Sequence, residues 1–420
     1  MSLKLTTLTI QICLLSTALG EMRAWVNDKN RSAEGELISA TETHAVIHFK
    51  GQKSSREVAL TTLSTNDQEF IAEWLTQEKD KSTKKKVTYD PNASYRDRQK
   101  NLSALTENIP DNFDAEWPKL IKSPEGLEIA LVEEDATNNK YVYHSNHYEF
   151  ICDVPLKPHL VKRFATLFEG TREVCRALPI STKKAHIAGE THRNRILLFE
   201  TREAYVKNGG PPQSGGVFIG GKDIVMVPLT SLGVKKVGSS YSIDYKDDNK
   251  TLSHELAHQI TDRVYYQLGA RGWFSEGLAD YVGTTPYRSG NFFISKSVGA
   301  AKEYATGFGR EGNGGRHMGE KISAPDLKTY MLQDYSRFTG ENANFNYGLA
   351  LLITSYFFHM DGDGDRVAIT SFLKALREGK KGEEALEVLR QGRTFDELAK
   401  DISKGWRSKG VRITFPESGE

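Results

Sequence analysis

The segment His254-Glu255-Leu256-Ala257-His258 places two imidazoles and a carboxylate in an order suited to metal chemistry. Residues four apart share one face of an α-helix, so both histidines can present a ring nitrogen to one metal ion. Zinc binds imidazole nitrogen at about 2.0–2.1 Å, and a glutamate beside the ion can take a proton from its bound water. The immediate flanks contain no Pro or Gly, which favours a helix. The segment therefore predicts a zinc-binding helix with Glu255 as general base.

A second segment, Gly272–Tyr281, offers a third ligand. Catalytic zinc usually has three protein ligands and one open position. Glu276 lies 18 residues after His258, which leaves room for a turn and a second helix that return a carboxylate to the metal. Asp280 follows four residues later on the same helix face, so it can accept the distal N–H of a ligand histidine. The two segments together predict zinc ligation by His254, His258 and Glu276, with Asp280 behind them.

These segments resemble the gluzincin metallopeptidases, specifically the bacterial peptidase MA-like group, and the likeness extends over about 140–415. The resemblance implies a thermolysin-like α+β fold, in which a mixed sheet lies next to a helical subdomain and its edge strand lines the cleft. It also implies that His254, His258 and Glu276 bind Zn²⁺, that Glu255 later returns its proton to the leaving amine, and that Asp280 orients a ligand histidine. The implied substrate is a peptide or protein.

The apolar run Val217–Leu229, about 25 residues before the zinc helix, is the candidate edge strand. An extended peptide can bind such an edge by strand addition. Gluzincin aminopeptidases carry a Gly-x-Met-Glu-Asn stretch near this strand, and its Glu holds the α-amine of the substrate. Here Gly220–Met226 lacks that Glu, so this departure from the family pattern favours endopeptidase cleavage over aminopeptidase cleavage.

Peptide hydrolysis also needs a donor for the tetrahedral oxyanion besides the metal. Members of the resembled family often use a tyrosine some distance after the glutamate ligand, and Tyr347 is the candidate in this chain. A tyrosine that serves only to pack helices remains the alternative.

Residues 21–77 are expected to form a small β-barrel module. Alternating apolar residues in Thr43–Lys50 and a short run at Glu57–Leu60 predict strands, and a helix follows them. The segment resembles the Sla-type homology domain, a Src-homology-3-like barrel, in the following residues: Arg23-Ala24-Trp25, Gly35, Val58-Ala59-Leu60, Leu63-Ser64 and Asp67-Gln68. Such modules also occur in bacterial exported proteins, and a protein partner of this module is one of the partners considered.

The rest of the chain is expected to divide into a linker and one large domain. Residues 78–100 are polar and basic, as is typical of a solvated linker. Residues 101–420 are predicted to form the metallopeptidase domain, which is mostly helical after about 250. Its earlier part is expected to contain strands at Leu127–Glu133, Lys140–Tyr143, Tyr148–Cys152 and Arg195–Phe199, and a helix at Leu160–Leu178.

Charge and hydropathy exclude two classes of protein. The chain of 420 residues has 56 Lys and Arg against 55 Asp and Glu, without the basic excess of a general nucleic-acid binder. No apolar run approaches the roughly 18 residues that suggest a transmembrane helix. We therefore expect neither a nucleic-acid partner nor a transmembrane segment.

Met1–Gly20 has the features of a cleaved secretory signal, with Lys4, an apolar stretch and a small-x-small end at Ala18–Gly20. Export to the periplasm or the extracellular space is expected. In an exported chain, Cys152 and Cys175 can form a disulfide or can remain two buried thiols, and the sequence favours neither arrangement.

Two other functions are compatible with these residues. The chain can be a zinc-stabilised binding scaffold that uses its N-terminal module to recruit a partner, although a structural zinc site has no need of Glu255. It can also hydrolyse an amide that is not a peptide.

Overall fold

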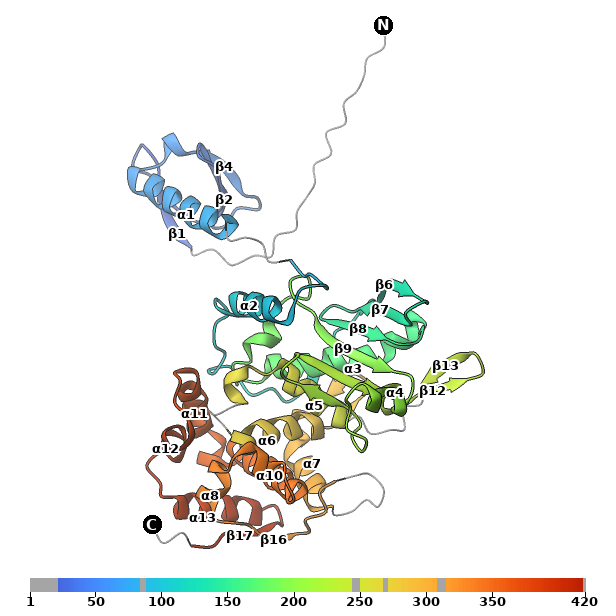
Figure 1. The fold of residues 1–420 in the computed structure, drawn as a ribbon. Helices are drawn as coiled ribbons and strands as arrows, with labels where there is room; N and C mark the ends of the chain where they lie inside the picture. The colour runs from blue at the N-terminus through green and yellow to red at the C-terminus, as the bar shows by residue number, and fades with distance from the viewer. Residues whose placement is uncertain (1–21, 84–87, 244–249, 267–270, 308–314, 418–420) are drawn as a thin grey trace. The chain divides into compact units, whose positions relative to one another are not determined.

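The computed structural model describes residues 22–83, 88–243, 250–266, 271–307 and 315–417 (Figure 1). The expected signal segment, residues 1–20, lies outside this part of the chain. The chain divides into two compact units, Met1–Lys86 and Val87–Glu420. Helices and strands occur in both units, so the fold class is α+β.

Unit 1 consists of a four-stranded antiparallel sheet and one long helix. Its elements are β1 (Arg23–Val26), β2 (Ser32–Ala40), β3 (His44–Phe49), β4 (Arg56–Ala59) and α1 (Thr65–Thr83). Trp25, Ala45 and Ile47 from the sheet pack with Leu63 and with Ile71 of the helix, and this small cluster is the core of the unit.

The closed barrel expected for this unit is not found among the described residues. The sheet order is β1-β2-β3-β4, and no ladder joins β4 to β1. After β4 the chain enters a 3₁₀ turn at Leu60–Thr62, and it meets the end of β1 at a bridge between Asn27 and Leu63. Asp28 N–H donates to Thr62 O and Ser64 N–H donates to Val26 O, so this segment meets β1 through a single bridge instead of a strand.

A six-stranded mixed sheet of order β10-β11-β9-β8-β7-β6 organises unit 2. Its strands are β6 (Ala130–Asp135), β7 (Lys140–His144), β8 (Tyr148–Cys152), β9 (Asn194–Phe199), β10 (Val217–Ile219) and β11 (Ile224–Pro228). The β8–β9 and β9–β11 pairs are parallel, whereas β6, β7 and β10 each pair with their neighbours in the antiparallel sense. The two edges of this sheet are therefore β10 and β6.

The segment expected as one strand, Val217–Leu229, is a hairpin instead. Within the turn at Gly220–Asp223, Lys222 N–H donates to Ile219 O at 2.9 Å, and Asp223 has a φ of +55°. The positive φ of this turn thus falls on Asp223 and not on the two glycines at its start. Of the two strands of this hairpin, β10 is thus an edge strand of the sheet and β11 lies inside it.

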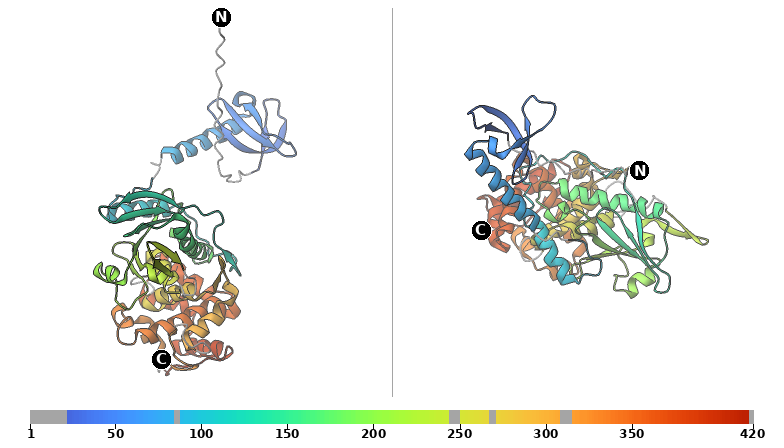
Figure 2. Two further views of the ribbon diagram at one scale, coloured as in Figure 1. Left: turned by 90° about the vertical axis from the view of Figure 1, so that its right-hand side faces the viewer. Right: turned by 90° about the horizontal axis from the view of Figure 1, so that it is seen from above.

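Helices and short strands make up the rest of unit 2, and the yellow to red helices of Figures 1 and 2 lie together beside the green sheet. The helices are α2 (Tyr95–Thr106), α3 (Pro158–Ala177), α4 (Arg202–Lys207), α5 (Lys250–Ile260), α6 (Arg271–Thr284), α7 (Ser297–Thr306), α8 (Leu327–Leu332), α9 (Tyr335–Phe338), α10 (Ala343–His359), α11 (Val367–Arg377), α12 (Gly382–Arg390) and α13 (Phe395–Arg407). The short strands are β5 (Ile121–Lys122), β12 (Val234–Val237), β13 (Ser240–Ile243), β14 (Tyr287–Arg288), β15 (Asn291–Phe292), β16 (Lys321–Ser323) and β17 (Arg412–Thr414). None of the described helices is both long enough and apolar enough to cross a membrane.

Helix α3 connects the sheet to the helix that carries the His-Glu-x-x-His motif. On one side, the ring of Phe168 lies 5.2 Å from that of Phe150 on β8. On the other side, Thr171 Oγ1 lies 3.2 Å from Ser253 Oγ on α5. Both contacts are buried, so α3 fixes the position of α5 relative to the sheet.

The range expected as a linker, 78–100, includes the end of α1 and the start of α2. Arg98 on α2 is buried, and its guanidinium donates to Lys222 O at 3.3 Å. The second part of this basic range is therefore packed on unit 2.

Cys152 and Cys175 are both buried and unpaired. Burial raises the pKa of each thiol to about 12. Of the two arrangements that the sequence allowed, the structure contains the pair of free thiols.

Gly277 lets α6 approach α10. A Cβ at this position would lie 2.2 Å from Thr354 Oγ1 and 2.6 Å from Ala350 O. We expect Gly277→Ala to lower the free energy of unfolding by about 1–3 kcal/mol, the usual result of overpacking, in urea titrations.

Gly299→Ala on α7 is the matched control, because nothing lies within 4 Å of a Cβ built there. Alanine at this open helical position is expected to raise stability by up to about 1 kcal/mol. Equal stability of the two variants would show that α6 and α10 are not in close contact at Gly277.

Candidate metal centre

Helices α5 and α6 bring the three proposed ligands together (Figure 1). His254 and His258 lie one turn apart on α5 and are each 8% exposed, and Glu276 on α6 is 1% exposed. The two helices approach closely at Gly283, where a Cβ would lie 2.7 Å from Lys250 O. A side chain at 283 would push α6 away from α5, so this glycine keeps the carboxylate within reach of the histidines.

The donor atoms of these residues form a compact triangle. His254 Nε2 lies 3.0 Å from His258 Nε2, and Glu276 Oε2 lies 3.2 and 3.1 Å from these two nitrogens. Two ligands bound tetrahedrally to zinc at about 2.0–2.1 Å are about 3.3 Å apart, so the spacing fits a tetrahedral ion. Among the described residues, this is the one group of three or more His, Cys, Asp or Glu that can hold a metal ion.

The electrostatics of the triangle also suit a cation. Burial opposes a charge on Glu276, but His258 and His254 outweigh it and hold the pKa of the carboxyl well below its usual range. Burial likewise opposes protonation of His254, yet hydrogen bonds to Asp280 and Glu276 raise its pKa. In the metal-free protein, protons therefore balance the buried carboxylates, and a divalent cation would displace them.

Asp280 lies behind His254. Its Oδ1 is 2.8 Å from His254 Nδ1, so the imidazole can donate Nδ1–H and leave Nε2 for the metal. Arg316 in turn donates to both oxygens of Asp280, at 2.9 and 3.2 Å. Its guanidinium also lies 4.7 Å from the centre of the Tyr347 ring. Arg316, Asp280 and His254 thus form one hydrogen-bonded chain that ends at the metal triangle.

Asp280→Asn is expected to weaken zinc binding by about 10- to 100-fold, the usual effect of losing a hydrogen-bond partner of a ligand histidine. The affinity is measured by competition with a fluorescent chelator at fixed pH. The exposed Asp114 provides the control Asp114→Asn, which should bind zinc as the wild type does. If both variants kept the wild-type affinity, Asp280 would not support His254.

Two side chains at the site were not indicated by the sequence. One is Arg316, and the other is Tyr335 on α9, whose hydroxyl donates to Glu276 Oε1 at 2.8 Å. Arg316 lies in a glycine-rich segment, and Tyr335 is 59 residues from Glu276 on a helix of four residues. Neither has a periodic relation to the motif, so no sequence signal tied them to it.

Tyr347 on α10 lies next to the triangle. Its ring is 6.1 Å from that of His254, with an angle of 26° between the planes. Burial and the charge of Glu276 raise its pKa, so the hydroxyl keeps its proton and can donate. The ring also lies 5.5 Å from Phe338 in the core. This position is compatible with both roles that the sequence left open, donor and packing residue.

The side chain of Glu255, on α5, extends to the edge strand β10. Burial raises the pKa of its carboxyl, which suits a group that must accept a proton near neutral pH. Its Oε2 accepts the backbone N–H of Phe218 at 2.7 Å. The Phe218 ring lies 6.4 Å from the ring of His258, so Glu255, His258 and the edge strand are neighbours.

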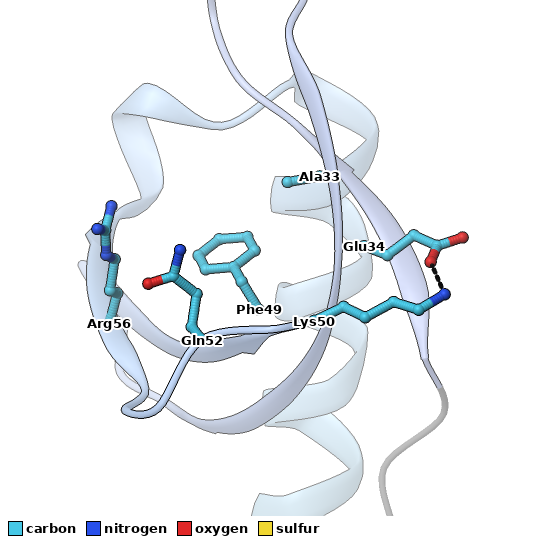
Figure 3. A pocket seen from close by; sticks show the side chains of 6 residues that line it. All are labelled: Ala33, Glu34, Phe49, Lys50, Gln52 and Arg56. Atoms are coloured by element: carbon cyan, nitrogen blue, oxygen red, sulfur yellow. Dashed lines mark hydrogen bonds and ion pairs between the residues drawn. The ribbon is translucent and has the colours of Figure 1, made fainter.

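Unit 1 contains a separate hollow of about 460 Å³ (Figure 3). It is lined by Ala33, Glu34, Phe49, Lys50, Gln52 and Arg56. The Lys50 ammonium pairs with Glu34 Oε2 at 2.6 Å, and both side chains are well exposed. None of the three candidate metal ligands lines this hollow.

No family model matches the chain, and neither the curated proteins nor the solved structures include a match to it.

Proposed function

We propose that the protein is a zinc-dependent metallopeptidase of the gluzincin type, which hydrolyses peptide bonds. The observation that supports this most strongly is the triangle of three buried donor atoms, 3.0–3.2 Å apart, with the carboxylate of Glu255 next to it. Two histidines and one glutamate are a known ligand set of catalytic zinc in peptidases, whereas structural sites are usually closed by four Cys or His ligands. Three protein ligands leave a position for water and substrate.

A zinc ion bound by His254, His258 and Glu276 would supply Lewis-acid chemistry, because it polarises a carbonyl group and lowers the pKa of water. Glu255 then accepts the proton of the attacking water and donates it to the leaving amine. The buried carboxylate is suited to both steps because its raised pKa brings the two protonation states closer in energy.

The residues around the triangle fill the remaining roles. Tyr347 and Tyr335 keep their hydroxyl protons, since burial, together with the nearby charge of Glu276, raises the pKa of each. The Tyr347 hydroxyl can therefore donate to negative charge that develops on the substrate oxygen, whereas Tyr335 already donates its proton to Glu276 Oε1. Asp280 and Arg316 hold His254 in place.

The substrate is proposed to be an extended peptide that lies along β10. This strand is an edge of the mixed sheet, and Phe218 at its centre neighbours both Glu255 and His258. The turn that follows, Gly220–Asp223, contains no glutamate to hold a free α-amine. We therefore favour cleavage within chains over removal of N-terminal residues.

Cleavage of a diverse peptide library by the zinc-loaded protein tests this function, with products identified by mass spectrometry. Internal cuts that disappear in a chelated sample are expected. Removal of single N-terminal residues would instead identify an aminopeptidase. A folded, zinc-loaded protein that cuts nothing would favour the binding scaffold.

A further inference from the structure

The edge strand β10 donates a backbone hydrogen bond to Glu255. The N–H of Phe218 lies 2.7 Å from Glu255 Oε2. Phe218 stands opposite Val225 of β11, and its N–H is directed to α5 instead of to that strand. Among the described residues, no other hydrogen bond to the Glu255 carboxylate is found.

This donor has little freedom to move. β10 pairs with β11, and β11 pairs with β9 inside the sheet. Gly216 precedes β10, and a Cβ there would lie 3.2 Å from Met226 O and 3.8 Å from Glu255 Cγ. Glycine at 216 thus lets the chain enter β10 close to Met226 O of β11. A backbone N–H held in a sheet keeps its direction, whereas a side-chain donor can rotate away.

We propose that the backbone N–H of Phe218 is a positioning group for the general base, an inference that rests on the proposed function. With Oε2 held by Phe218, Oε1 of Glu255 remains to accept a proton. A general base must lie about 2.6–3.2 Å from the atom whose proton it takes. Without the bond, the carboxylate can turn about its side-chain torsions and lose this geometry.

The rival interpretation is a resting contact that the substrate displaces. A peptide that added to β10 in full register would use both the outward N–H and the outward C=O of Phe218. A positioning bond must persist during catalysis, so the peptide would pair through the C=O alone. Removal of the N–H distinguishes the two interpretations, because it lowers kcat in the first, whereas in the second it removes a hydrogen bond to the peptide, raises KM and leaves kcat unchanged.

Replacement of Phe218 by phenyllactate, which converts the amide to an ester, removes the N–H and keeps the ring. We expect kcat for a library-derived peptide to fall by about 10- to 100-fold, the range for losing a hydrogen bond to a charged acceptor. KM should stay within about twofold, and zinc content should not change. These two readouts separate a positioning role from general damage to the site.

Phe218→Pro is a second variant, which decides the matter if the ester protein does not fold. Proline is tolerated on an edge strand where the N–H does not pair with the neighbouring strand. Phe218→Ala is its matched control, since both variants lose the ring and only proline loses the N–H. We expect kcat of the proline variant to be about 10- to 100-fold below that of the alanine variant.

Hydrogen exchange gives a readout that is independent of activity. The Phe218 amide should exchange more slowly in the wild type than in Glu255→Ala. Equal kcat in the ester and wild-type proteins, with KM unchanged or raised, or unchanged exchange would each overturn the inference while the proposed function stands. A wild type that cleaves no peptide would overturn both.

Discussion

In Glu255→Gln, kcat for peptide hydrolysis is expected to fall by about 10²- to 10⁴-fold, the range that general acid–base catalysis contributes. The variant should still bind zinc. Glutamine keeps the size of the side chain and an oxygen that can accept the N–H of Phe218. It cannot take up a proton from water. The measurements are kcat for one peptide and zinc per chain by elemental analysis.

The stability of this variant provides an internal check. The folded-state pKa of Glu255 is raised by burial, so its ionisation weakens folding as the pH rises above the pKa of an unfolded glutamate. A neutral glutamine avoids this loss, and at neutral pH the variant should unfold at the same temperature as the wild type or at a higher one. The exposed Glu378 supplies the control Glu378→Gln, which should keep full activity. If Glu255→Gln still hydrolysed peptides at the wild-type rate, Glu255 would not be the base.

Glu276→Gln is expected to weaken zinc binding by more than about 100-fold, beyond the 10- to 100-fold cost of losing a residue that only supports a ligand. Glu276 supplies the one negative charge among the three donors, and its low pKa keeps it charged. An amide oxygen binds zinc less well than a carboxylate does, and Tyr335 would lose its charged acceptor. When zinc is limiting, the rate of peptide hydrolysis by Glu276→Gln should fall together with its zinc occupancy.

Competition with a fluorescent chelator measures the affinities of Glu276→Gln, Asp280→Asn and Glu378→Gln under one set of conditions. Glu378→Gln is expected to bind zinc as tightly as the wild type does. Asp280→Asn should bind it less tightly, and Glu276→Gln least tightly of all. If Glu276→Gln bound zinc as tightly as the wild type, the third ligand would have to be another residue.

The helices that carry the ligands could be predicted because their functional residues recur at helical spacing. His254 and His258 are four apart, as are Glu276 and Asp280, and each pair lies on one helix in the structure. Helix α3 was predicted for the same reason, within two residues at its start and one at its end. Local periodicity is enough to define such elements.

Other features depend on contacts that local patterns do not contain. The hairpin β10–β11 was taken for one strand because the apolar run Val217–Leu229 masks the short turn inside it. The prediction of a closed barrel was wrong. Closure requires that the edge strands β1 and β4 be joined by hydrogen bonds, and a 3₁₀ turn follows β4 instead. Arg316 and Tyr335 reach the site only after α6, α9 and the 315–319 segment pack together. Such residues become visible only when the tertiary structure is known.

Zinc titration of the metal-free protein tests the central claim most directly, with bound zinc and peptide cleavage measured in the same samples. The metal site and the proposed peptidase activity predict that cleavage rises in proportion to bound zinc and stops rising at one ion per chain. Full occupancy of the site without cleavage of any library peptide, or equal cleavage in the metal-free protein, would contradict the claim that His254, His258 and Glu276 form the zinc centre of a peptidase.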